Sequence, residues 1–297
     1  MLGVVNLDKP VGPTSHDMVG MLRRLTGTRR IGHAGTLDPL ASGVLPILVG
    51  PATRFSAELT GGSKRYDAVI RLGARSATDD AEGPIEPVEG PVPDEEAVRA
   101  ALSTFVGAFE QRPPTFSARK LGGRTAHRAA RAGDPLDVPP RTVTIHSLDL
   151  LDYERTDDGA DVHVDLRCGA GTYVRSLARD LGERLGTGGY LRALRRTEAA
   201  GLTVDTAVTP ERLQVLADEG RLGEAIMPVG DLLPLPRVDL DADAARAFRN
   251  GSARPLTGVA AADGRAAVFE GPELIGIGSV ASNVLQPEKV LPTEAVP

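Results

Sequence analysis

The chain has 297 residues, of which 41% are hydrophobic and 25% are charged, a composition typical of a soluble globular protein with a substantial core. Its single cysteine excludes an intramolecular disulfide and a cysteine-rich zinc site, and no apolar run approaches the ~20 residues that span a bilayer. The net charge of −6 disfavours a nucleic-acid partner only if charge is evenly spread, and here the signs are segregated.

The first predicted elements are a strand over residues 4–7 and a helix that begins after Thr14. Thr14 and Asp17 have the spacing of a capping box, and Gly27 has the position of a helix end. Residues 1–8 lack the basic and apolar regions of a signal peptide, so we expect a cytoplasmic protein. The apolar face of the helix consists of Met18, Met21, Leu22 and Leu25.

The next stretch, residues 32–43, reads Gly-His-Ala-Gly-Thr-Leu-Asp-Pro-Leu-Ala-Ser-Gly and holds one carboxylate, Asp38. Its glycines and Pro39 favour a stiff, tightly turned loop. An aspartate beside proline is also ordinary turn chemistry, but a solvated loop is rarely so poor in Lys, Glu, Gln and Asn. An apolar run over 44–50 follows, and Pro46 favours a central strand that begins near Ile47. We therefore predict a functional carboxylate on a loop that leads into the core.

Residues 32–43 resemble the catalytic motif of the TruB family, the bacterial tRNA pseudouridine-55 synthases. The resemblance implies that Asp38 is the essential catalytic residue. His33 is expected to contact RNA or to support the loop. Lys9-Pro10 matches a second short motif, which in the family packs beside the catalytic loop, and both residues are therefore candidates for substrate binding.

Lys64-Arg65-Tyr66 resembles a further catalytic motif, in which the tyrosine lies against the target base. These residues open a predicted strand over 64–72, and its alternation alone would favour a core tyrosine. A base that leaves its stack would, however, regain energy on an aromatic face. The resemblance therefore implies a catalytic role for Tyr66.

Two later motifs complete the implied site. Residues 171–175 read Gly-Thr-Tyr-Val-Arg and open a helix that we expect Thr172 to cap. In the family the arginine of this motif, here Arg175, pairs with the catalytic aspartate, and such pairing would keep Asp38 ionised. Tyr173 lies in the same turn and is expected to bind substrate. Residues 190–197 match the last motif, whose leucine, here Leu194, walls the uracil pocket.

Residues 112–131 contain six Lys or Arg residues and no acid. Such a run favours a surface that faces phosphates, whereas isolated basic pairs such as Arg195-Arg196 are as consistent with a solvated face. Residues 116–124 resemble the start of a mobile family insertion that grips the T arm of tRNA, here over about 112–140, with Arg119 and Lys120 as RNA contacts. Phe116 and His127 stand where the family often has tyrosine.

The remaining pattern predicts an exposed acidic loop over 76–93, a helix over 94–106, and strands over 143–145 and 162–168 that place Cys168 on a buried face. A helix starts at Thr209-Pro210, and a proline-rich linker follows over 227–236. A helix over 241–248 and strands over 266–270 and 274–280 end the pattern.

The resemblance implies an α+β fold with a mixed, largely antiparallel central sheet flanked by helices. Residues 1–235 would form the catalytic domain, and residues 236–297 a small, β-rich, PUA-like RNA-binding domain.

Uridine isomerisation breaks the bond from N1 to the ribose and forms one through C5 without any redox change, so we expect no cofactor. The five histidines lack metal-ligand spacing, so we expect no metal. A glycoside or nucleoside hydrolase would need a second carboxylate or a metal cluster beside Asp38. A non-catalytic RNA-binding or tRNA-folding protein stays open. The expected partner is the T stem-loop of tRNA, without a membrane or an obligate protein partner, and the expected state is a monomer.

Overall fold

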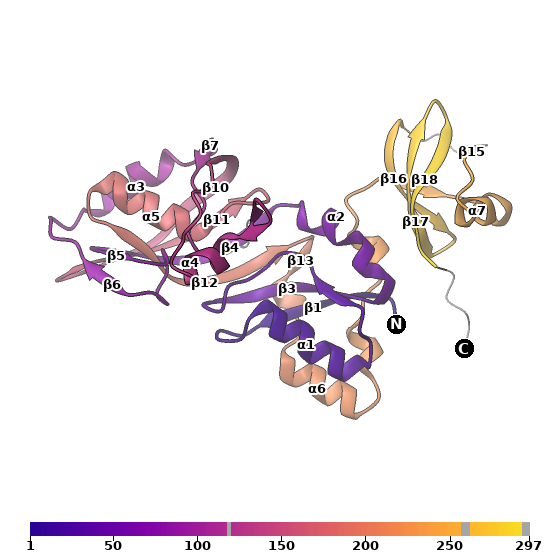
Figure 1. The fold of residues 1–297 in the computed structure, drawn as a ribbon, viewed down its shortest axis with the longest axis horizontal. Coiled ribbons are helices and arrows are strands. Elements are labelled where there is room, and N and C mark those ends of the chain that lie inside the picture. Colours follow the sequence, from indigo (N-terminus) through magenta and orange to yellow (C-terminus); the bar gives the residue numbers. More distant parts are fainter. Residues whose placement is uncertain (118–119, 257–261, 293–297) are drawn as a thin grey trace.

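A computed structural model describes residues 1–117, 120–256 and 262–292 of the chain, which form a large domain and a smaller C-terminal domain (Figure 1). The large domain is built on a nine-stranded sheet. The smaller domain holds a separate five-stranded sheet. Within the described ranges, no helix combines the length and apolar character needed to cross a membrane.

The large sheet follows the order β1-β3-β12-β4-β11-β10-β7, with β2 paired to β3 and β13 paired to β12. All of these pairings are antiparallel except one, in which Leu194–Arg196 of β12 run parallel to Ala41–Gly43 of β3. The predicted mixed, largely antiparallel sheet is thus confirmed. Its strands are β1 (Gly3–Lys9), β2 (Ile31–His33), β3 (Ala41–Val49), β4 (Lys64–Leu72), β7 (Gly107–Gln111), β10 (Arg141–Thr156), β11 (Gly159–Cys168), β12 (Gly189–Ala199) and β13 (Leu202–Thr203).

Helices pack against this sheet and bury a continuous apolar core. The predicted capping box of the first helix is present, with Thr14 and Asp17 exchanging hydrogen bonds and Gly27 ending the helix at φ 66°. Cys168 is buried in the core, and burial raises the pKa of its thiol to about 11. The helices of this domain are α1 (Ser15–Thr26), α2 (Ser56–Thr60), α3 (Glu95–Ser103), α4 (Ala126–Arg131), α5 (Val174–Leu185) and α6 (Pro210–Asp218).

Two local predictions are wrong. Strand β3 begins at Ala41 and runs through Pro46, because β1 pairs with it continuously from Gly43 to Val49. On the other edge β12 pairs only with residues 41–43 and β2 only with residues 47–49, so the missing N–H of Pro46 leaves no ladder hydrogen bond unmade there, and its carbonyl accepts from Ala34. The N-cap of α5 is Tyr173 and not Thr172, whose hydroxyl donates to the carbonyl of Gly169 within the preceding turn.

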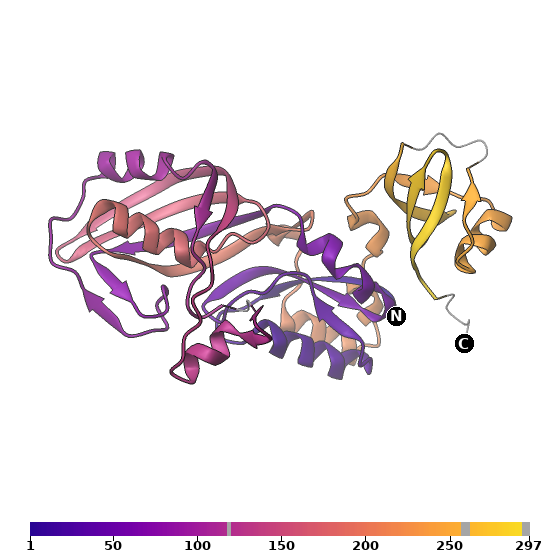
Figure 2. The same ribbon diagram turned by 45° about the horizontal axis from the view of Figure 1, so that its top comes forward.

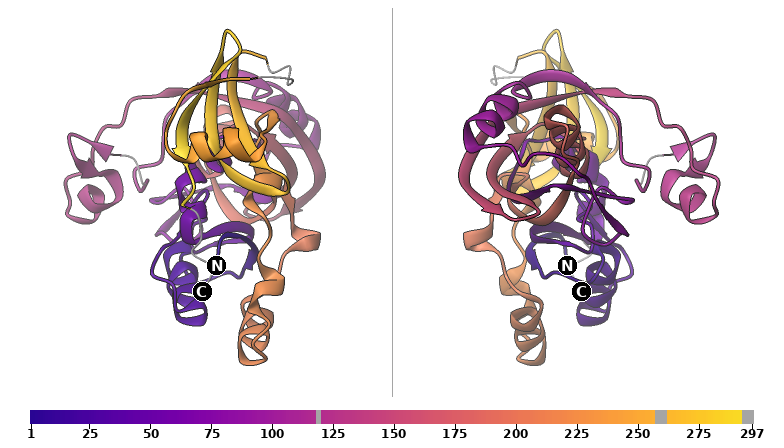
Figure 3. Two further views of the ribbon diagram at one scale, coloured as in Figure 1. Left: turned by 90° about the vertical axis from the view of Figure 1, so that its right-hand side faces the viewer. Right: turned by 90° about the vertical axis from the view of Figure 1, so that its left-hand side faces the viewer.

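A segment that includes a short hairpin and α4 connects β7 to β10. The hairpin consists of β8 (Lys120–Leu121) and β9 (Arg124–Thr125). Figure 3 shows this segment projecting well away from the rest of the large domain. A second hairpin, β5 (Ala74–Ser76) and β6 (Ile85–Pro87), follows β4.

The C-terminal sheet has the order β14-β16-β17-β18-β15, with α7 packed against it, and confirms a β-rich C-terminal domain. The proline-rich segment before it is packed between the sheets, where Val229 and Leu233 are buried with Phe269. The elements are β14 (Arg237–Asp239), α7 (Ala242–Arg249), β15 (Arg254–Pro255), β16 (Gly264–Glu270), β17 (Glu273–Ala281) and β18 (Val284–Val290).

Candidate active site

The loop that carries Asp38 joins β2 to β3 and is held by backbone hydrogen bonds from α1 and the turn before it. The hydroxyl of Ser15 donates to the carbonyl of Leu37 and accepts from its N–H, both at 2.8 Å. The N–H of Gly12 donates to the carbonyl of Pro39 at 2.9 Å. The loop is therefore stiff, as its composition predicts.

Arg196 holds the same loop from behind. Its side chain is fully buried, and its Nε donates to the carbonyl of Val44 at 2.7 Å and its Nη2 to that of Gly35 at 3.0 Å. The grouping of Arg196 with solvated or phosphate-facing basic pairs is therefore wrong. The signal that could have found it is the period of two in β12, which puts Arg196 on the same face as Leu194.

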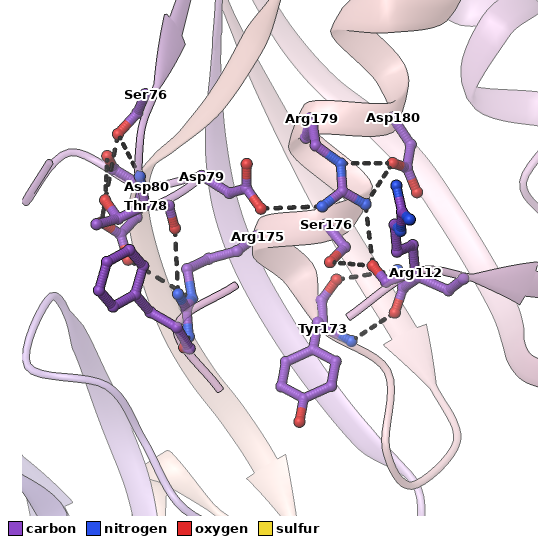
Figure 4. Close-up of polar contacts among 12 residues, drawn as sticks. Ser76, Thr78, Asp79, Asp80, Arg112, Tyr173, Arg175, Ser176, Arg179 and Asp180 are labelled. Carbon is purple, nitrogen blue, oxygen red and sulfur yellow. Dashed lines mark hydrogen bonds and ion pairs between the residues drawn. The ribbon is translucent and has the colours of Figure 1, made fainter. Parts of the chain in front are cut away.

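Arg175 lies at the start of α5 and pairs with Asp38. Its Nε is 2.9 Å from Oδ2 of Asp38, and its side chain is 8% exposed, whereas that of Asp38 is 42% exposed. The two remaining nitrogens donate to backbone, Nη1 to the carbonyl of Thr78 at 3.1 Å and Nη2 to that of Phe116 at 2.9 Å (Figure 4). Every nitrogen of the guanidinium is engaged, so the orientation of Arg175 is fixed.

Two acids expected in an exposed loop instead face α5. Asp80 is buried, with Oδ2 3.5 Å from Nε of Arg175 and Oδ1 accepting from the hydroxyl of Thr78. Asp79 pairs with Nη1 of Arg179 at 3.0 Å, and burial raises its pKa (Figure 4). The predicted exposure of residues 76–93 is therefore wrong at this point, because the partners of both acids lie about a hundred residues further along the chain.

Asp38 borders a cavity of about 300 Å³. The cavity lies between the Asp38 loop, β4, β12 and the start of α5, and its walls include the buried ring of Tyr66. Burial raises the pKa of the Tyr66 hydroxyl, so the ring is neutral. The structure thus brings five of the predicted site residues to one cavity, namely Asp38, Tyr66, Tyr173, Arg175 and Leu194.

The other predicted residues lie elsewhere. His33 borders a second cavity of about 600 Å³ that Asp38 and Arg175 also line, and burial and Arg196 lower the pKa of His33. Lys9 is fully buried beneath the loop, outside both cavities, and donates to the carbonyls of Pro10 and Pro13 at 2.8 Å. Burial lowers its pKa to about 8. Two of the three ammonium donors of Lys9 are thus engaged by the turn, and its contact with substrate stays a prediction.

Pro10 is exposed but borders neither cavity. Arg119 and the side chain of Lys120 lie outside the described residues. Sequence reasoning also missed Lys64 as a cavity residue, because a lysine at a strand start is usually solvated. Its ammonium is buried at the wall and donates to the carbonyls of Thr60 at 2.8 Å and Gly62 at 2.9 Å.

The arrangement suits a flat, neutral ring held beside a carboxylate. Tyr66 and Leu194 supply aromatic and apolar surface, and Asp38 supplies a negative charge that Arg175 compensates and aims. Such a carboxylate can act as a nucleophile or can stabilise positive charge as a bond to the ring breaks. In the part of the chain that the structure describes, no cluster of metal-binding side chains accompanies it.

Comparison with known proteins identifies the family. Residues 23–174 match the model of the TruB family pseudouridylate synthase N-terminal domain, and residues 175–234 that of the tRNA pseudouridylate synthase B C-terminal domain. A tRNA pseudouridine synthase B of Ralstonia pickettii (strain 12J) is 44% identical over 86% of this chain and 80% of its own. Another, of Ralstonia nicotianae, is 40% identical over 97% of this chain and 94% of its own.

Among solved structures, a chain from an H/ACA RNP bound to a substrate RNA containing 2'-deoxyuridine superposes with a TM-score of 0.74. It is 26% identical and covers 99% of this chain and 86% of its own length. The sequence motifs, the cavity beside Asp38 and these matches lead to one conclusion: the chain belongs to the TruB family of pseudouridylate synthases.

Proposed function

We propose that this enzyme converts uridine to pseudouridine at position 55 in the T arm of tRNA, with Asp38 as the essential carboxylate. The observation that carries the proposal is the ion pair between Asp38 and Arg175 at the wall of a cavity that Tyr66 and Leu194 also line. The curated relatives at 40–44% identity are named tRNA pseudouridine synthase B, which supports tRNA as the substrate.

Each side chain at the cavity has a separate role in binding the target base or in orienting the carboxylate. The target base leaves its stack and lies against Tyr66, which replaces part of the lost stacking energy. Leu194 and Tyr173 wall the pocket, and Arg175 holds the carboxylate of Asp38 in place. His33, at the neighbouring cavity, faces RNA next to the target nucleotide.

The projecting segment supplies the grip on RNA. We assign this role to residues 112–140, with Arg119 and Lys120 as contacts. Arg112 pairs with Asp137 and Arg124 with Asp134, each at 2.9 Å and largely exposed. Exposed ion pairs are worth about 0–1 kcal/mol, so phosphates can displace these carboxylates at little cost.

We further infer a division into a catalytic domain over 1–235 and a PUA-like RNA-binding domain over 236–297. One chain supplies the carboxylate, the arginine and the tyrosine of the cavity, so we infer that the enzyme acts as a monomer without an obligate protein partner. Light scattering on a sizing column tests this inference, and a dimer mass at working concentration would contradict it.

A tritium-release assay tests the proposed reaction. Enzyme is mixed with unmodified tRNA labelled at C5 of uracil, because isomerisation alone frees the C5 hydrogen to water. We expect release from wild-type tRNA and none above background from tRNA whose U55 is replaced by cytidine. Asp38→Asn should bind the same tRNA without turnover, whereas an RNA-folding protein without catalysis would release no tritium even as the wild type.

A further inference from the structure

Glu58 of α2 is an unusually buried acid for a short surface helix, with a side chain that is 5% exposed. Its Oε1 is 2.7 Å from Nζ of Lys289 on β18 and 2.8 Å from Nη2 of Arg265 on β16. Burial would raise the pKa of Glu58, but hydrogen bonds from Lys289 and Arg265 outweigh burial and lower it. Glu58 is thus an ionised anchor in the large domain for two cations of the C-terminal domain.

The residues around Glu58 join the same interface. Lys289 also donates to the carbonyl of Arg54 at 3.0 Å, and the guanidinium of Arg54 donates to the carbonyl of Val290. Phe55, beside them, is buried in one apolar cluster with Phe269 of the C-terminal sheet. Figures 1 and 2 show α2 on the side of the large domain that faces this sheet. The C-terminal domain therefore clamps α2 by charge and by apolar packing.

The other end of α2 reaches the active site. Thr60, the last residue of the helix, lines the cavity that contains Asp38, and its carbonyl accepts from the ammonium of Lys64. Lys64 lies two residues before Tyr66 on β4 and packs close to the catalytic loop, because a Cβ on Gly35 would be 3.6 Å from its Cε. A continuous line of contacts thus runs from the C-terminal sheet to the loop of Asp38.

Most of the basic side chains of the C-terminal domain form ion pairs within the protein. Residues 236–292 contain six Lys or Arg residues and seven Asp or Glu residues. Among these described residues, five of the six cations form ion pairs with carboxylates, namely Arg237, Arg246, Arg249, Arg265 and Lys289. A balanced surface attracts a phosphate backbone weakly, so docking on α2 is the better supported use of Arg265 and Lys289.

We propose that Glu58 is a positioning residue for the isomerisation, through which the docked C-terminal domain fixes α2, Thr60 and Lys64 and thereby the cavity wall next to Asp38. The proposal rests on the proposed function. In this proposal the contacts of Glu58 affect the shape of the cavity and not the affinity for RNA. Loss of these contacts should therefore lower the rate on any substrate, including one too short to reach the C-terminal domain.

The test compares Glu58→Gln with Glu288→Gln. Glu288 is the matched control, since it pairs with Nε of Arg265 at 2.8 Å from within the C-terminal domain. Single-turnover tritium release at saturating enzyme is measured on whole tRNA and on a hairpin of the T arm alone, and dissociation constants are measured by filter binding. We expect Glu58→Gln to lower the rate constant about tenfold on both RNAs with unchanged affinity, since small misplacements of a site are costly. Glu288→Gln should stay within about twofold of wild type.

Two results would overturn the proposal: an unchanged hairpin rate in Glu58→Gln, or a loss confined to weaker binding of whole tRNA. If Glu58→Gln fails to fold by circular dichroism, Lys289→Met removes the same contact from the other domain and must show the same rate loss. A wild-type enzyme that releases no tritium from either RNA would instead refute the proposed function.

Discussion

The guanidinium of Arg196 donates to the carbonyl oxygen of Gly35, 3.0 Å away, from a fully buried position behind the catalytic loop. Its three nitrogens donate to the backbone carbonyls of Val44, Thr36 and Gly35, so its planar set of donors acts as a frame for the loop. The same side chain also lines the cavity beside Asp38, so a buried cation links the catalytic loop to the cavity wall.

Arg196→Lys should therefore damage both the fold and the reaction. A lysine ammonium is a compact donor that cannot reach Gly35 and Val44 together, so buried carbonyls lose their partners. We expect unfolding in urea to show a loss of about 2 kcal/mol or more, and tritium release to fall with it. Arg195→Lys is the control, since Arg195 is half-exposed and pairs with Asp8, and it should cost no more than about 1 kcal/mol. Equal losses in the two variants would show that Arg196 is not a frame.

Asp38 and Asp80 both contact Arg175, but they should respond differently to replacement by asparagine. Asp38→Asn should lower turnover by at least about a thousandfold and change stability by less than about 1 kcal/mol, since the side chain is half-exposed. Asp80→Asn removes a buried, hydrogen-bonded charge and should cost about 1.5–3 kcal/mol. Thermal and urea unfolding measure the stability of both variants, and the tritium assay measures their turnover. A larger loss of stability in Asp38→Asn than in Asp80→Asn would contradict the placement of these acids.

Gly43 of β3 pairs with Arg196 of β12. Its φ is +100°, and a Cβ there would lie 2.2 Å from the carbonyl oxygen of Arg196. Gly43→Ala should therefore cost at least about 2 kcal/mol and distort the catalytic loop. Gly27→Ala is the control, because Gly27 also has a positive φ, of +66°, but open space around its Cβ, and should cost about 1 kcal/mol. Urea unfolding of both variants gives the two losses in stability. Equal losses would contradict a steric clash at Gly43.

The burial of Lys9 should make the stability of the protein depend on pH. Its pKa in the fold is about 8, below the ordinary value of 10.5, because burial disfavours the ammonium. Between these two values the unfolded chain binds more protons than the folded chain, so the free energy of unfolding rises with pH. The free energy of unfolding of the wild type minus that of Lys9→Met should rise by up to about 1.4 kcal/mol per pH unit from pH 8 to 10. The same difference should stay constant from pH 6 to 7. Urea unfolding at each pH measures this difference. A difference that does not change with pH would show that burial does not lower the pKa of Lys9.

Local signals predicted much of the fold. The capping box of α1 and the alternation of β4 depend on residues within one helix turn or one strand, and both are present in the structure. The burial of Asp80 and Arg196 could not be predicted in that way, since each is decided by a partner that lies far off in sequence. The burial of Lys9 has a related cause, since no local signal indicates that a lysine beside proline donates to the carbonyls of its own turn.

The parallel pairing of β3 with β12 brings residues 41–43 beside residues 194–196. A nascent chain on the ribosome carries Asp38 early but cannot complete the surroundings of that carboxylate until the second of these segments has emerged. Premature termination before that point would thus yield polypeptides with no isomerising ability, and synthesis itself delays activity until most of the protein has been made.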